Sequence, residues 1–149
     1  MRKIIYLRPD GRTCVVNPAM NSVEAPDFTE ADAEARAMAK IPPSAINPHF
    51  VDESAIPADR TFRNAWNADL TVDMPKAREI HKETLRKLRA PILEQAAGDY
   101  TNADIAKDEA KKTELAAKIT ALRDVTDDPA IAAAQTPEQL KAAIPDVLK

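Results

Sequence analysis

Glycine, cysteine and aromatic residues are scarce in this sequence, and each scarcity narrows what the protein can be. Only two glycines occur in 149 residues, which argues against the glycine-rich loops that cradle phosphate groups. A single cysteine, Cys14, allows no internal disulfide and gives no sign of an oxidising compartment. Aromatic residues make up 4% of the chain. Alanine supplies much of the apolar content, so we expect a core with few large side chains.

Long hydrophobic runs are also missing. The apolar run at 4–7 is too short for a signal peptide, and no stretch is long enough to span a membrane. The net charge of −3 and the low pI argue against a dedicated nucleic-acid binder, whose surface is normally basic. These features favour a cytoplasmic protein, or a component assembled in the cytoplasm, with no membrane partner.

The groups that catalysis or metal binding requires are few and scattered. Neither histidine, His49 or His81, has the spacing to a second histidine or to Cys14 that metal ligands show. Cys14 falls in a predicted strand, and nothing matches it with a histidine. Acidic pairs such as Asp127 and Asp128 occur on any charged helix surface, and a hydrolase built on them would need a concave pocket. The sequence therefore predicts no cofactor, no metal site and no enzymatic activity.

The first part of the chain reads as a small β module. Strand-forming residues at 4–7 and 13–16 flank Asp10 and Gly11, which can supply a tight turn, so we expect a β-hairpin. A loop over 17–28 and a short helix over 29–40, capped by Thr29, should follow. Four prolines between 41 and 59 predict an extended connection, in which 49–54 forms an edge strand beside the hairpin.

The segment IPADRTFRNAW, at 56–66, holds the only tryptophan of the chain. Phe62 and Trp66 are four residues apart, so a short helix would place them on one face, although a β conformation of 61–66 is also possible. Large aromatic side chains usually supply buried area. We therefore expect Phe62 and Trp66 to be structural anchors between the β module and the helices, with Arg60 and Arg63 toward solvent or a partner.

Two long helices are predicted in the second part of the chain, over 71–95 and 102–124, packed as an antiparallel hairpin. Gly98 is the natural end of the first helix, and Pro91 should kink it. An apolar stripe follows one face of the first helix: Ala77, Ile80, Thr84, Leu85, Leu88 and Ile92. Ile105, Leu115, Ile119 and Leu122 are the larger apolar residues of the second. Two short helices should follow, starting at Pro129 and Pro137.

The first long helix is rich in basic residues, which include Arg86 and Arg89. A nucleic-acid surface is one interpretation, but the basic side chains are spread around the helix. A solvated face with local ion pairs is the interpretation we favour, followed by contact with an acidic partner. Together the patterns predict an α+β protein, with a small α+β module at 1–59 and a helical region at 60–149.

Three stretches, taken together and in this order, resemble a family of small proteins from tailed bacteriophages. They are IPADRTFRNAW, VDMPKAREIHKETLRKLRAPIL and ALRDVTDDPAIAAAQTPEQLKAAIP. The opening, IIYLRPDG followed by VVNP, also resembles that family, and the helical part is similar to the phage tail assembly chaperones, with Leu122, Arg123 and Asp124 as its Leu-Arg-Asp element. Relatives often carry no glycine at position 98, which implies a first helix that runs on to a turn at 104–108.

The resemblance implies a protein of the phage tail or tail fibre that works through contacts with other tail proteins, in several copies. We expect a virion adaptor, located in the host cytoplasm during assembly and then in the tail. A transient assembly chaperone is the alternative, and a regulatory or nucleic-acid-binding module is a further one. Arg60, Arg63, Arg86 and Arg89 are the expected partner contacts.

Overall fold

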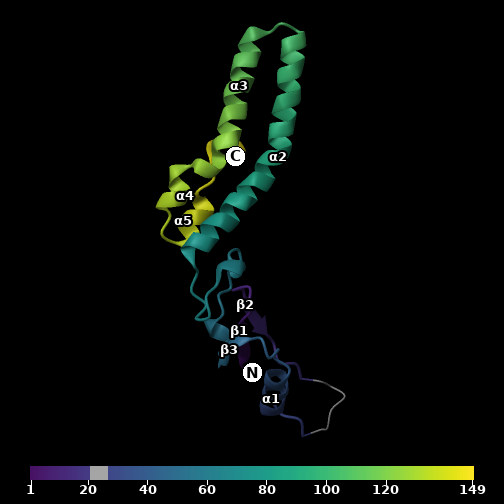
Figure 1. The fold of residues 1–149 in the computed structure, drawn as a ribbon, viewed down its shortest axis with the longest axis vertical. Coiled ribbons are helices and arrows are strands. Elements are labelled where there is room, and N and C mark those ends of the chain that lie inside the picture. The colour runs from purple at the N-terminus through teal and green to yellow at the C-terminus, as the bar shows by residue number, and fades with distance from the viewer. Residues whose placement is uncertain (21–26) are drawn as a thin grey trace. The chain divides into compact units, whose positions relative to one another are not determined.

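A computed structural model describes residues 1–20 and 27–149, which form two compact units, Met1–Asp73 and Met74–Lys149. Half of the loop expected over 17–28 therefore lies outside the described residues. The mixed α+β class is confirmed, with a sheet in the first unit and helices in the second (Figure 1). The division falls after Asp73 and not after residue 59. The reason is that the segment at 56–66, called the aromatic segment below, packs into the first unit through Trp66.

The first unit is built on a three-stranded antiparallel sheet in the order β2-β1-β3. Strands β1 (Lys3–Leu7) and β2 (Thr13–Val16) form the expected hairpin, and Gly11 takes the positive φ of 75° that its turn requires. Strand β3 (Ile46–Val51) pairs with the other side of β1 and includes Pro48. A proline is tolerated there because β3 is an edge strand. The sequence predicts this edge strand, but at 49–54, three residues later than the structure has it.

Helix α1 (Glu30–Ala39) begins where the sequence places it. The Thr29 hydroxyl accepts a hydrogen bond from the Asp32 amide, and the Asp32 carboxylate accepts one from the Thr29 amide. This reciprocal cap satisfies two amide groups that the first turn would otherwise leave without partners.

The aromatic segment forms a single 3₁₀ turn, η2 (Arg63–Ala65), and not a longer helix. Phe62 precedes the turn and Trp66 follows it, each only 3% exposed. Trp66 is extended and pairs with Val72 in an isolated β-bridge. The helical interpretation therefore holds only for the single turn at Arg63–Ala65. The chain leaves the helical conformation at Trp66 because the residues on either side of it pair with the returning chain: the Asn67 amide donates to the carbonyl of Thr71, and the carbonyl of Ala65 accepts from the Asp73 amide.

The second unit is dominated by two antiparallel helices, α2 (Met74–Ile105) and α3 (Glu109–Arg123). Helix α2 continues through Gly98, so the predicted end at that residue is wrong and the turn lies at 106–108, as the family resemblance implied. One glycine costs a helix only about 1 kcal/mol. Ala96 and Ala103, on either side of Gly98, are buried, and that packing outweighs the cost. Lys107, with a φ of 58°, makes the turn.

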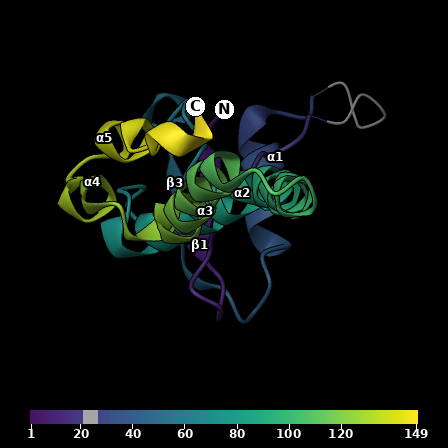
Figure 2. The same cartoon turned by 90° about the horizontal axis from the view of Figure 1, so that it is seen from above.

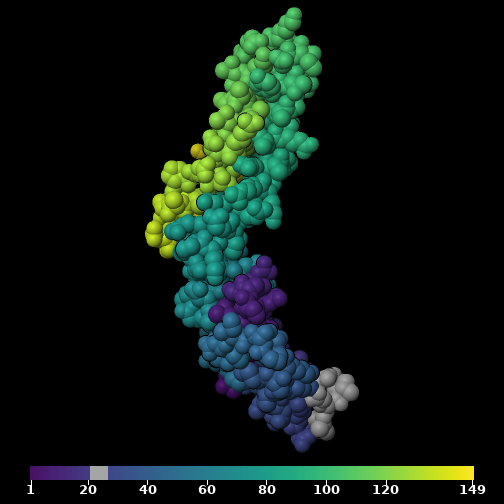
Figure 3. Space-filling model, viewed as in Figure 1, coloured from purple at the N-terminus to yellow at the C-terminus, as the bar shows by residue number. Residues whose placement is uncertain are grey.

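The buried face of α2 differs from the predicted stripe. Its buried residues are Ala77, His81, Leu85, Ala96 and Ala103, whereas Leu88 is 49% exposed. Figure 1 shows that the direction of α2 changes near its middle. Pro91 is near the middle of the Met74–Ile105 range and lacks the amide that would bond to the carbonyl of Lys87, which accounts for a bend in this part of the helix. In Figure 3 side chains fill the space between the α2 and α3 ribbons.

Short helices close the base of this hairpin: η3 (Asp124–Asp127), α4 (Pro129–Ala133), α5 (Pro137–Ala142) and η4 (Asp146–Leu148). Figure 2 shows α4 and α5 on one side of the α2–α3 pair. Asp128 and Thr136 cap α4 and α5, with Pro129 and Pro137 in the first positions, as predicted.

The largest fully buried side chains of the second unit gather at this base: Leu85, Leu122, Val125, Ile131 and Leu140. Among the helices of the described residues, none combines the length and apolar character that a membrane span requires.

Candidate protein-contact site

Trp66 lies at the centre of the core of the first unit. It packs with Ile5 of β1 and with Leu70, and smaller apolar residues surround this cluster. The Thr13 hydroxyl lies 2.6 Å from the carbonyl oxygen of Trp66 and 3.1 Å from that of Asn67. Strand β2 therefore holds the backbone of the aromatic segment in place, and every one of these contacts is internal to the first unit.

Arg60 and Arg63 sit on the same segment, and both are exposed. The amide of Arg63 donates to the carbonyl of Arg60 at 3.1 Å, which folds the short turn that separates the two side chains. The buried Phe62 and Trp66 fix the backbone from which these guanidinium groups project. An anchored cation of this kind loses less conformational freedom when it binds a partner.

Arg86 and Arg89, the two expected partner contacts on α2, have different surroundings. Arg86 is exposed and lies 3.4 Å from the carboxylate of Glu83. Arg89 donates to the carbonyl oxygens of Leu122 at 3.3 Å and Arg123 at 2.6 Å, the last residues of α3. A cation at that position stabilises the negative end of the helix dipole. Arg89 therefore holds the helical hairpin together.

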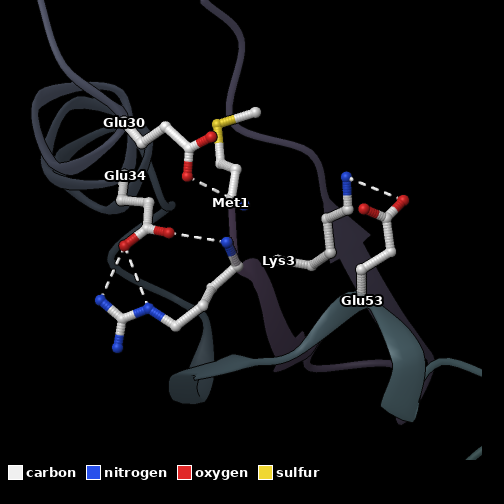
Figure 4. Close-up of polar contacts among 6 residues, drawn as sticks. Met1, Lys3, Glu30, Glu34 and Glu53 are labelled. Carbon is white, nitrogen blue, oxygen red and sulfur yellow. Dashed lines mark hydrogen bonds and ion pairs between the residues drawn. The ribbon is translucent and has the colours of Figure 1, made fainter.

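A cluster of ion pairs that no local sequence pattern indicates lies at the start of β1 (Figure 4). Arg2 donates to Glu34 of α1 three times: from its amide at 2.6 Å, from Nη2 at 2.7 Å and from Nε at 3.1 Å. Glu34 is only 7% exposed, and these hydrogen bonds lower the pKa of its carboxyl group. The terminal amine of Met1 pairs with Glu30 at 2.9 Å. The contacts tie α1 to the sheet.

An open groove of about 500 Å³ runs beside this cluster. The Arg2 guanidinium lies 4.4 Å from the centre of the Phe50 ring, a cation–π contact at the margin of the groove. Glu34 also lines the groove, and the remaining lining is apolar and comes from one face of α1: Ala31, Ala35, Met38 and Ala39. The groove therefore has an apolar floor and, at its margin, an arginine whose charge Glu34 already balances. Such a surface suits an apolar peptide segment.

The side chains with catalytic potential are held in separate places. Cys14 lies on β2 and His49 on β3, with β1 between them. A hydrogen bond with the Cys14 side chain is the main cause of the raised pKa of Tyr6, its neighbour across the hairpin. His49 contacts the carbonyl of Asn47, and His81 belongs to the second unit. In residues 1–20 and 27–149 no group of three or more histidine, cysteine or acidic residues is placed to hold a metal ion.

His81 is a second residue whose role the sequence did not reveal. It is 7% exposed, and its Nε2 lies 2.9 Å from the carbonyl oxygen of Ala143, beyond the end of α5. A buried carbonyl without a donor is costly, so this bond fixes the C-terminal segment on α2.

No protein-family model, curated protein or solved structure matches this chain.

Proposed function

We propose that this chain is a non-enzymatic tail or tail-fibre protein of a tailed bacteriophage, and that it acts through protein–protein contacts as an adaptor retained in the virion. The assignment to a phage tail is supported by the three sequence stretches that resemble tail-associated proteins in the same order. The contact role is supported by one structural observation. Glu34, His81 and Arg89 are engaged in holding elements together, whereas Arg60 and Arg63 stand exposed on a buried aromatic anchor.

The first unit offers two features to a partner. One is the groove between α1 and Phe50, with Arg2 at its margin. The other is the pair Arg60 and Arg63. The groove presents apolar surface beside the Arg2–Glu34 ion pair, and Arg60 and Arg63 present positive charge. The partner that fits best therefore presents apolar side chains to the groove and acidic side chains to the two arginines.

A charge-reversal experiment tests this contact role. The double variant Arg60→Glu/Arg63→Glu should lose co-purification with the neighbouring tail or fibre protein when the two are expressed together. The matched control is Arg8→Glu/Arg12→Glu, which makes the same charge change at exposed positions of the hairpin turn and should leave co-purification intact. Equal loss in both variants, or in neither, contradicts a specific role for Arg60 and Arg63.

The adaptor role is tested on purified particles of the encoding phage. Quantitative mass spectrometry should find the chain at a fixed ratio to the other tail proteins, in several copies per particle. If the chain is abundant in infected cytoplasm and missing from the particles, the protein is a transient assembly chaperone instead.

A nucleic-acid-binding module remains the alternative from another class, because six basic side chains occur in the first half of α2. Two of them already serve the fold, since Arg78 donates to the carbonyl of Ala134 and Arg89 to the end of α3. This alternative predicts a complex with duplex DNA at low salt that weakens steeply as salt rises. A gel shift without any complex at low salt would exclude it.

A further inference from the structure

An uncharged stripe follows one exposed face of α2. Its members recur every three or four residues, the spacing at which side chains line up along a helix that packs on another helix. All of them are exposed: Thr84, Leu88, Pro91, Gln95, Gly98 and Asn102. Charged residues make up 30% of this chain, so a stripe of this length without any charge is unusual for a surface that faces only water.

Gly98 is the residue of the stripe whose lack of a side chain is not required by packing within the described part of the chain. A Cβ atom added at Gly98 would meet nothing within 4 Å. The helix therefore carries a destabilising residue that no neighbour among residues 1–20 and 27–149 requires. A glycine on an exposed helix face permits the close approach of a second helix.

The charges on α2 are segregated along its length. Its first half, 74–89, carries six basic side chains against Glu79 and Glu83, and its second half, 90–105, carries three acidic side chains and no basic ones. Two such helices placed side by side in parallel would oppose like charges. Placed antiparallel, they bring the basic half of each beside the acidic half of the other.

We propose that the stripe is a two-fold interface between two copies of this chain, in which the two α2 helices run antiparallel. The stripe is self-complementary about its centre, as a two-fold interface requires. Each Leu88, 49% exposed in the single chain, packs over Gly98 of the second copy, and Pro91 lies beside the second copy's Gln95. In an antiparallel pair the large Leu88 of each helix therefore faces the small Gly98 of the other.

A hydrogen bond near Pro91 would favour the same antiparallel arrangement. Pro91 has no amide to donate to the carbonyl of Lys87, so that carbonyl lacks its regular helical donor at the position of Pro91. In the antiparallel arrangement the side-chain amide of Gln95 from the second copy reaches this carbonyl and donates to it. The bend at Pro91 also curves both helices at the centre of the interface.

This pairing does not depend on the phage assignment, since it rests on α2 alone. A single helix pair is a small interface, and we expect micromolar association. Light scattering coupled to size exclusion should show a mass rising from 16.3 kDa toward twice that value as the concentration increases from about 10 µM to about 1 mM. A mass that stays at 16.3 kDa across this range overturns the proposal.

Substitutions in the stripe identify the interface. Gly98→Leu and Leu88→Glu should each shift self-association to at least tenfold higher concentration. Ala97→Leu is the matched control, because Ala97 is exposed but lies about 100° away around the helix, and it should leave association unchanged. Circular dichroism verifies that all three variants remain helical. If Gly98→Leu associates as well as the control, the stripe is not the interface.

Cysteine cross-linking tests the orientation. In a Cys14→Ser background, a mixture of the Leu88→Cys and Gly98→Cys proteins should form the mixed disulfide dimer under mild oxidation. Either protein alone should form little, because an antiparallel pair places two copies of position 88 about 15 Å apart along the helix. Efficient cross-linking of Leu88→Cys with itself would show a parallel pair and overturn the proposal.

Discussion

Truncation of Trp66 to alanine tests how the first unit is held together. The ring is 3% exposed and packs on Ile5 and Leu70. A buried aromatic side chain removes about 150–250 Å² from water, which corresponds to about 4–6 kcal/mol at 25 cal/mol per Å². Alanine keeps a small part of this area and the cavity relaxes in part. We therefore expect Trp66→Ala to destabilise the first unit by about 3–5 kcal/mol.

Hydrogen exchange followed by mass spectrometry is the suitable assay, because it reports on the two units separately. Exchange in β1 and β3 should accelerate in Trp66→Ala, while α3 in the second unit keeps its protection. Arg63→Ala, an exposed substitution on the same segment, is the control and should change stability by less than about 0.5 kcal/mol. If Trp66→Ala behaves like Arg63→Ala, the ring is not the core residue that its burial indicates.

Three further substitutions test individual contacts. Arg2 lowers the pKa of Glu34 in the folded protein, so the ionised carboxylate stabilises the fold above its unfolded-state pKa of 4.5. This stabilisation is lost as the pH falls through the lower folded-state pKa. Glu34→Gln should therefore make the thermal unfolding of the first unit less sensitive to pH below about 4.5. His81→Leu should cost the second unit about 1–3 kcal/mol in urea unfolding, since the buried carbonyl of Ala143 loses its donor, and an unchanged midpoint would contradict this. Arg89→Leu should cost about 1–2 kcal/mol and loosen the end of α3 in hydrogen exchange, whereas Arg86→Leu should have little effect.

Local signals in the sequence predicted most element boundaries. Thr29, Asp128 and Thr136 start helices because their side-chain oxygens accept backbone hydrogen bonds within three residues. Gly11 marks the hairpin turn for an equally local reason. Predictions of this kind hold because both partners in each interaction are neighbours in the chain.

Predictions that depended on distant contacts were less secure. Gly98 was expected to end a helix, but the burial of Ala96 and Ala103 carries α2 past it. Leu88 was expected in the core, but it is 49% exposed, whereas Leu85, three residues earlier, is fully buried. For Trp66 both a helical and a β conformation were expected; it is extended, bridged to Val72, and its carbonyl accepts a hydrogen bond from Thr13 of β2. In each case a partner remote in sequence decided the outcome.

By itself the sequence determined the order and type of the elements, their caps, and the separation of a sheet-forming part from a helical part. Those properties follow from backbone preferences and from hydrogen bonds between near neighbours. Only the tertiary structure decided that Arg2 hydrogen-bonds Glu34, that Arg89 caps α3, and which face of α2 is exposed. The physical reason is that an apolar or charged side chain can be satisfied by many partners, and the packing of the whole unit selects one of them.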